Sequence, residues 1–166
     1  MKSKLIMRVS SLALVPFTIA SSLFFLVSCA QRQSPYSLML EFCKNYGIDS
    51  VVFSPEISEG EAGYTDEDFF KTVFDEGIES VEDYAIVFLS SLDYVGECSV
   101  FLCYSEYDAL RVCDMLRRRI DLLKSVGAGI NTSYVSESVI FKSGKYVVMC
   151  SLADNELAER IWKKLL

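Results

Sequence analysis

The chain contains no histidine, so the side chains that remain for catalysis or metal binding are chiefly its six cysteines and its carboxylates. Without histidine, Ser-His-Asp and Cys-His catalysis are excluded, as is every metal site with an imidazole ligand. The usual acid–base group near neutral pH is also missing. No segment matches a calcium loop with alternating oxygen ligands and a central glycine. The sequence contains no motif that identifies a catalytic, cofactor-binding or metal site, so we predict none of the three.

Acidic residues gather around a helix that is predicted to begin near Thr65 and to end at Gly77. These residues are Asp66, Glu67, Asp68, Asp75 and Glu76. A general acid–base pair among them would suit glycoside hydrolysis, which needs two carboxylates in one cleft. Acidic residues at a helix N-terminus are also expected from the helix dipole alone, and this structural interpretation is the one we favour.

Cys29 directly follows an apolar segment. The first eight residues include three basic ones, and no further charge occurs before Arg32. A positive start followed by an apolar stretch is typical of an export signal. The sequence Leu26-Val27-Ser28-Cys29 resembles the bacterial lipobox. This resemblance implies that the Cys29 thiol receives diacylglycerol, that the chain is cut before Cys29, and that the new amino group is acylated.

An uncleaved membrane helix over Val9–Val27 is the alternative anchor, since its 19 residues are close to the ~20 that cross a bilayer. Two acyl chains are sufficient to hold a protein stably, at about 0.8 kcal/mol per buried methylene. Both interpretations place residues 30–166 on the extracytoplasmic face of the cell membrane. We predict the lipid anchor, with membrane lipid contacted through Cys29.

Removal of residues 1–28 would leave 138 residues, enough for one domain, and would change the net charge from −7 to −10. The phosphates of nucleic acids and of anionic lipids repel such a domain, so we expect no nucleic-acid partner. Residues 49–97 hold 14 acidic residues and one basic residue. This segment would suit a cation or a basic partner, although a solvated surface explains it as well.

The chain divides into a signal peptide at 1–28, a tether with a short helix and an acidic loop at 29–64, and a domain at 65–166. The short helix is predicted to run from Ser34-Pro35 to Gly47, and the acidic loop covers 54–64. Two β-hairpins, each followed by a helix, are predicted in the domain. Their elements are strands 84–92 and 97–104, a helix from Ser105 to Gly127, strands 135–142 and 145–151 around Ser143-Gly144, and a helix from near Leu152 with Leu157, Ile161 and Leu165 on one side.

This ββαββα order, preceded by one or two helices, predicts an α+β fold. We expect a mostly antiparallel sheet with helices packed on one face.

If Cys29 carries lipid, an odd number of cysteines remains: Cys43, Cys98, Cys103, Cys113 and Cys150. At least one thiol is then unpaired within the chain. In one continuous strand Cys98 and Cys103 would point to opposite faces, ~17 Å apart and beyond disulfide reach. Most of these residues are interpreted as small buried hydrophobes. A disulfide between two elements, such as Cys113 with a strand cysteine, remains open, as does a metal or catalytic thiol.

Charged residues outside the helix at 65–77 give three further candidates. Arg117, Arg118 and Arg119 would bind an anionic partner such as a wall polymer, or form a solvated helix face. Glu97 is interpreted as a buried pairing partner or as a ligand contact. Asn131-Thr132-Ser133 matches a glycosylation sequon, which we treat as chance beside a bacterial lipobox.

From about Thr65 onward the chain resembles a family of small lipoproteins, mainly of Gram-positive bacteria, that carry a domain of unknown function. The resemblance is carried by the helix before Gly77-Ile78, by "GECSVF" at 96–101, by the helix with the arginine run, and by "SVIFKSGKYVVMCSLADNELAERIWKKL" at the C-terminus. Glu97 lies where members of this family tend to carry a glutamate. The family implies the location and the fold, and it assigns no activity.

The sequence therefore predicts a lipid-anchored accessory or binding protein of the bacterial cell envelope, with an envelope protein or polymer as its partner. The alternative is a histidine-free envelope hydrolase that uses carboxylates on wall polymer or glycan. A third hypothesis is a folded spacer without a ligand.

Overall fold

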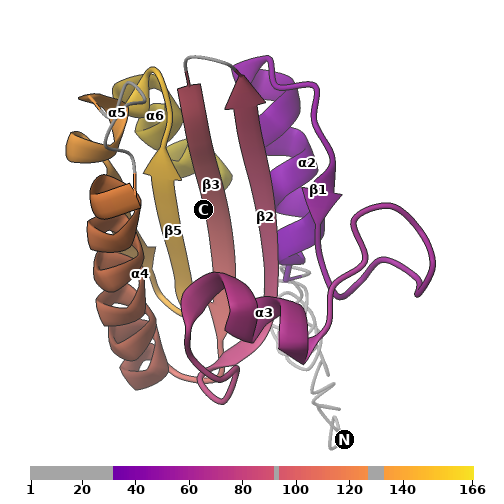
Figure 1. Cartoon of the computed structure of the whole chain (residues 1–166). Helices are drawn as coiled ribbons and strands as arrows, with labels where there is room; N and C mark the ends of the chain where they lie inside the picture. The colour runs from indigo at the N-terminus through magenta and orange to yellow at the C-terminus, as the bar shows by residue number, and fades with distance from the viewer. Residues whose placement is uncertain (1–31, 92–93, 127–132) are drawn as a thin grey trace, which may run out of the picture. The chain divides into compact units, whose positions relative to one another are not determined.

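An antiparallel five-stranded sheet in the order β1-β2-β3-β5-β4 forms the centre of the fold (Figure 1). The computed structural model describes residues 32–91, 94–126 and 133–166. Its strands are β1 Val52–Phe53, β2 Val81–Ser91, β3 Tyr94–Cys103, β4 Val139–Ser143 and β5 Tyr146–Ser151. Every neighbouring pair is antiparallel, which confirms the predicted α+β class and the antiparallel sheet.

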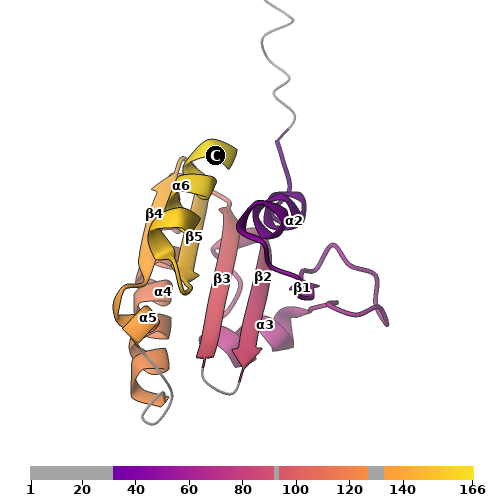
Figure 2. The same cartoon turned by 90° about the horizontal axis from the view of Figure 1, so that it is seen from above.

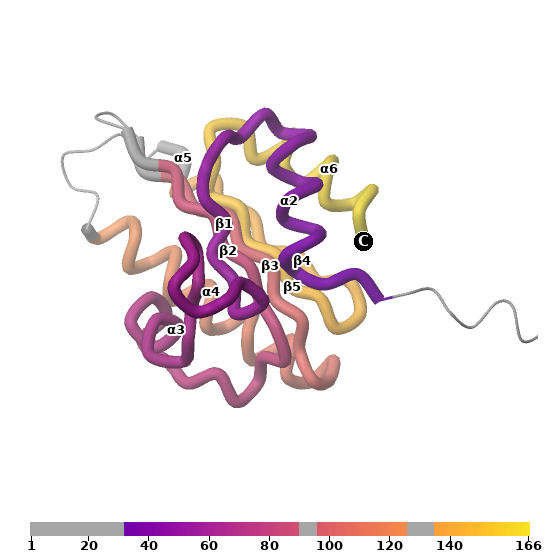
Figure 3. The backbone as a smooth tube through the Cα atoms, turned by 90° about the vertical axis from the view of Figure 1, so that its right-hand side faces the viewer, coloured from indigo at the N-terminus to yellow at the C-terminus, as the bar shows by residue number. Residues whose placement is uncertain are grey.

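Helices cover both faces of the sheet, so the prediction of helices on one face was wrong. Helices α3 Glu67–Phe74 and α4 Glu106–Val126 lie on one side, and α2 Pro35–Tyr46 and α6 Asn155–Leu165 lie on the other (Figure 2). Figure 3 shows α2 and α6 side by side on their face. The physical reason lies in the strands: Tyr84–Val87 and Val147–Cys150 are buried at every position. Such continuous burial is typical of a sheet that is covered on both sides.

The local signals for helix ends were largely correct. Ser34 caps α2 by accepting a hydrogen bond from the Ser37 N–H, and Gly47 ends the helix with φ 85°. The Ser105 hydroxyl accepts from the Asp108 N–H at 3.1 Å, as expected for the cap of α4. These residues supply partners for the free backbone groups at helix ends, which is why the sequence marks the ends clearly.

Two helices differ from the prediction at their ends. Helix α3 is capped by Asp66 instead of Thr65, and it ends at Asp75 in the left-handed region instead of at Gly77. Helix α6 begins at Asn155, not near Leu152, because Asp154 is its N-cap. Its buried centre is formed by Ala158 and Trp162. The residues predicted for that side, Leu157, Ile161 and Leu165, are only partly buried.

The compact unit is Gln33–Leu166, so it includes α2 and β1, which the sequence-based division grouped with the tether. The Phe42 ring of α2 stacks on Trp162 of α6 with 4.8 Å between ring centroids. The sequence also missed β1 and the one-turn helix α5 Ser133–Ser136, and β4 begins four residues later than predicted. The signal peptide, Cys29, Gly127 and Asn131 lie outside the described residues.

Candidate functional site

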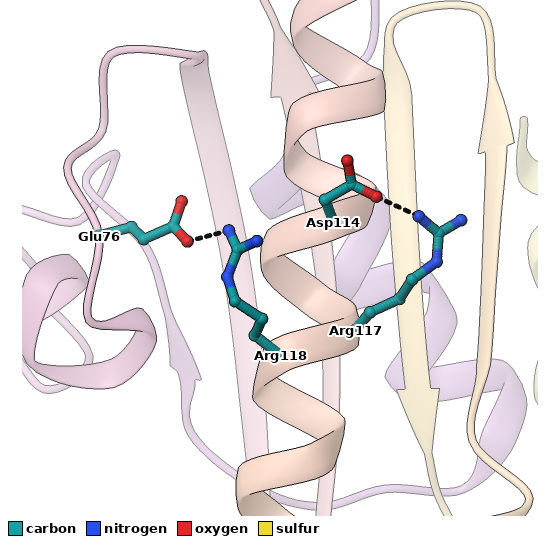
Figure 4. Close-up of polar contacts among 4 residues, drawn as sticks. All are labelled: Glu76, Asp114, Arg117 and Arg118. Atoms are coloured by element: carbon teal, nitrogen blue, oxygen red, sulfur yellow. Dashed lines mark hydrogen bonds and ion pairs between the residues drawn. The ribbon is translucent and has the colours of Figure 1, made fainter.

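The arginine run of α4 is occupied by carboxylates of the same chain. Arg117 pairs with Asp114 one turn earlier, and Arg118 pairs with Glu76 beyond the end of α3 (Figure 4). Both arginine side chains are more than half exposed, at 65% and 61%. Exposed ion pairs contribute at most about 1 kcal/mol each, so these two arginines remain accessible to competing anions.

Arg119 differs from its neighbours because it is directed into the protein. Its Nη2 and Nε donate to the same Glu97 oxygen, Oε2, at 2.7 and 3.1 Å. Its Nη1 donates to the Val73 carbonyl of α3 at 3.0 Å. The guanidinium also lies 6.0 Å from the centroid of the Phe74 ring. Arg119 therefore ties α3 and α4 to the central strand β3.

Glu97 is the most deeply buried carboxylate of the described residues, with 2% of the residue exposed. Burial raises the pKa of Glu97, and the charge and hydrogen bonds of Arg119 act in the opposite direction. Its second oxygen, Oε1, has no hydrogen-bond partner among the described residues. The interpretation of Glu97 as a buried pairing partner is confirmed. Because only 2% of the residue is exposed, a ligand in solution does not reach it in this conformation.

The acidic residues around α3 have structural roles. The Asp66 carboxylate accepts from the Phe69 N–H at 2.8 Å and caps the helix. Glu67 and Asp68 stand in the first turn, and Asp75 is the C-cap. Capping and the helix dipole account for Asp66, Glu67 and Asp68, as we favoured from the sequence, whereas Asp75 ends the helix through its left-handed backbone.

A carboxylate that the sequence did not single out is Asp83 of β2. Burial raises its pKa from the ordinary 3.8 to about 6, the Tyr84 N–H lowers it, and the charges of Glu56 and Glu82 raise it further. The Tyr84 N–H donates to Asp83 Oδ1 at 2.7 Å. Asp83 follows an irregularity in the β2–β3 register, between Val81 and Asp83. Sequence patterns do not locate such a bulge, so this residue carried no signal.

The five cysteines of the described residues are all buried and unpaired. As predicted, Cys98 and Cys103 point to opposite faces of β3: Cys98 lies under α2 and α6, and Cys103 under α3 and α4. Cys98 faces Cys150 of β5, with 3.5 Å between the two sulfur atoms. No group of His, Cys, Asp and Glu within the described ranges has an arrangement that would hold a metal ion.

A groove runs between α4 and the edge strand β4, and we call it the α4–β4 groove. Its volume is about 490 Å³, and its lining residues are Leu110, Cys113, Asp114, Arg117, Ile140, Phe141 and Lys142. The Lys142 ammonium pairs with Glu106 at 3.3 Å. Leu110 within the groove is 55% exposed, and Tyr107, one turn earlier on α4, is 71% exposed. The groove thus combines exposed apolar surface with basic groups.

Among residues 32–91, 94–126 and 133–166, no helix has the length and apolarity that a membrane span requires. Comparisons of the chain with protein-family models, with curated proteins and with solved structures found no match. The geometry of the described residues is therefore the basis for the functional proposal.

Proposed function

We propose that this chain is a lipid-anchored, extracytoplasmic binding protein of the bacterial cell envelope that holds an extended acidic polypeptide segment in the α4–β4 groove. The observation that carries this proposal is the position of β4. Among the described strands it pairs with β5 on one side only, and the groove lies along it.

The free edge of β4 favours a peptide over a glycan. An edge strand presents unpaired N–H and C=O groups, and an extended peptide satisfies both by adding a strand to the sheet. Alternate side chains of the added strand would then contact the apolar lining around Leu110 and Ile140. The five residues of β4 match a ligand segment of about 17 Å.

The charges at the groove favour acidic side chains on the ligand. Two basic residues, Arg117 and Lys142, line the groove together with one carboxylate, Asp114. Their ion pairs with Asp114 and Glu106 involve carboxylates that are 62% and 72% exposed. Exchange of these partners for ligand carboxylates therefore costs little.

The anchor in this proposal is Cys29, on the strength of the lipobox resemblance. The Tyr146 hydroxyl of β5 donates to the Gln33 carbonyl at 2.6 Å, so the fold holds the chain from Gln33 onward. Gln33 is four positions after Cys29 in the sequence, so the two residues lie at most about 14 Å apart. The domain would thus work close to its membrane. The proposal includes the ββαββα arrangement, with β2–β3–α4 and β4–β5–α6 as its two units.

The groove is tested by fluorescence anisotropy with a labelled eight-residue peptide of alternating valine and glutamate. Leu110→Glu places a charge in the groove, and we expect at least a tenfold loss of affinity. Leu122→Glu is the matched control, since Leu122 is 48% exposed on the same helix and does not line the groove. Equal affinities of the two variants would contradict the groove as the binding site.

A hydrolase that uses carboxylates is the second candidate, and Asp83 is the observation that favours it. A carboxyl group with a pKa of about 6 is suited to general acid catalysis near neutral pH. Under this alternative, Asp83→Asn abolishes release of sugars from purified wall polymer. Absence of release by the unchanged protein would eliminate it.

A further inference from the structure

Cys98 and Cys150 are directly opposite residues of the neighbouring antiparallel strands β3 and β5. Their sulfur atoms are 3.5 Å apart, and both residues are fully buried. The pair lies on the sheet face that α2 and α6 cover, where Trp162 is also buried. Burial, and after it the neighbouring Cys150, raise the pKa of the Cys98 thiol.

This geometry meets the requirement for a disulfide without movement of the backbone. Opposite residues of antiparallel strands have Cα atoms about 4.5–5.5 Å apart, and disulfides span Cα distances of about 4.4–6.8 Å. Rotation of the side chains is enough to shorten the sulfur–sulfur distance to about 2.05 Å. Cys103 lies on the opposite face of β3 and is excluded from this pair.

We propose that Cys98 and Cys150 are a redox site that forms a disulfide by exchange with a thiol-oxidising disulfide compound, protein or small molecule. One cysteine loses its proton, and its thiolate attacks the compound, forms a mixed disulfide and releases one thiolate. The second cysteine loses its proton and attacks the mixed disulfide, which forms the Cys98–Cys150 bond and releases the other thiolate. The two released thiolates take up the two protons. The pair is thus oxidised by two electrons, and the compound is reduced to two thiols.

Burial determines when the exchange takes place. With α6 in position neither sulfur is accessible, so exchange requires that α6 leaves the sheet or that the chain is still folding. Once formed, the bond joins the β2–β3 hairpin to the β4–β5 hairpin. The oxidising compartment that it needs is the extracytoplasmic one of the proposed function, and it does not depend on the peptide groove.

The test uses the full chain, unfolded in urea, refolded in a buffer of reduced and oxidised glutathione, and then unfolded again with alkylating reagent present, so that buried free thiols are also labelled. Trypsin is expected to release peptides Thr72–Arg111 and Tyr146–Arg160 as one linked species that reductant separates. Peptide Thr72–Arg111 contains both Cys98 and Cys103. Chymotrypsin cleaves between them, after Phe101 and Leu102, and so shows which of the two is linked to Cys150 in the protein without substitutions.

Variants provide the control and a second readout. Cys103→Ser is expected to keep the link, and Cys150→Ser to remove it. Oxidation is expected to raise the Tm of the unmodified protein by on the order of 10 °C, because the bond closes a long loop. Alkylation of both Cys98 and Cys150 in the chain unfolded after refolding, or a link that joins Cys98 to Cys43, would overturn the proposal. Failure of Cys150→Ser to fold would leave the peptide map of the unmodified chain as the decisive result.

Discussion

At the scale of single residues, the buried ion pair between Glu97 and Arg119 is the interaction whose loss we expect to lower stability most. Arg119 is 16% exposed and Glu97 2%. A buried pair contributes modestly over an apolar replacement, because desolvation offsets much of the attraction. Removal of one partner is different, since the remaining charge is left without compensation.

Arg119→Met is expected to lower the free energy of unfolding by about 3–5 kcal/mol, because Glu97 remains buried without its cation. Arg118→Met is the matched control on the same helix, and it should cost less than about 1 kcal/mol, since its pair with Glu76 is exposed. Urea denaturation measures both. Similar losses for the two variants would show that the buried pair has no special role.

Asp83 is expected to make stability depend on pH. Its pKa in the folded protein is about 6, above the ordinary 3.8 of the unfolded chain. The folded state therefore binds the proton more tightly, and the resulting stability is complete below about pH 4 and is lost as the pH rises through 6. Asp83→Asn should stabilise the protein by on the order of 1–2 kcal/mol at pH 7 and leave it unchanged near pH 4.

Thermal unfolding of Asp83→Asn at several pH values measures this effect, with the exposed Glu41→Gln as control. A gain in stability that is equal at pH 4 and pH 7 would argue against titration of Asp83 as the cause.

The sequence marked Glu97 and the arginine run but did not show that only Arg119 meets Glu97. Helical spacing places all three arginines at the flank of α4. Consecutive residues point in different directions around the helix axis, so the orientation of α4 about its own axis decides which arginine is directed inward. That orientation depends on how α4 packs on β3 and β5. Likewise, the facing positions of Cys98 and Cys150 follow from the strand register, which no local pattern of these residues specifies.

At the scale of elements, the caps of α2 and α4 were readable because each uses a side chain next to the backbone group that it satisfies. The end of α3 was not, because Asp75 adopts the left-handed conformation with φ 55°, two residues before the glycine that the sequence indicated. β1 has only two residues and no apolar alternation. Its place in the sheet comes from pairing with β2, which is a tertiary effect.

Gly60 and Gly63 in the loop at 54–64 give a matched prediction. Both have positive φ, at 90° and 94°, so a side chain is strained at either position. A Cβ at Gly60 would meet nothing within 4 Å, whereas a Cβ at Gly63 would lie 2.2 Å from the Val52 carbonyl oxygen. We expect Gly60→Ala to cost about 1 kcal/mol and Gly63→Ala several times as much.

Chemical denaturation of the two alanine variants measures these costs. The Gly63 carbonyl accepts from the Ser54 N–H at 2.9 Å, next to β1, so Gly63→Ala should also increase hydrogen exchange of β1. Equal costs at the two glycines would contradict the close approach.

At the scale of the whole molecule, the α+β class was predictable because the hairpins and helices have strong individual signals. The second helix layer was not predicted, since α2 was assigned to the tether. The buried residues of α2, such as Leu38 and Phe42, form an amphipathic pattern in the sequence. Such a pattern predicts that the helix is packed on one side, but it does not indicate which face of the sheet the helix covers. The unbroken apolar runs of β2 and β5 were the signal that both faces need cover.

The location of the molecule has its own test. Replacement of Cys29 by alanine is expected to abolish incorporation of labelled palmitate into the full chain and to release it from the membrane fraction. Both effects follow from loss of the thiol to which we propose that the lipid is attached. Persistent labelling, or membrane retention without labelling, would count against the lipid on Cys29 as the sole anchor.

The contacts at the first residues of the fold have a mechanical consequence. Any pull transmitted through the tether reaches the domain at Gln33, whose carbonyl is held by Tyr146, and at Ser34, whose hydroxyl donates to Glu56 at 2.8 Å. These two bonds lie on different parts of the chain and share the load before α2 is peeled from the sheet. A membrane-held domain with this arrangement would resist small forces at its attachment point, and it would yield by unwinding the first turn of α2 while the sheet stayed whole.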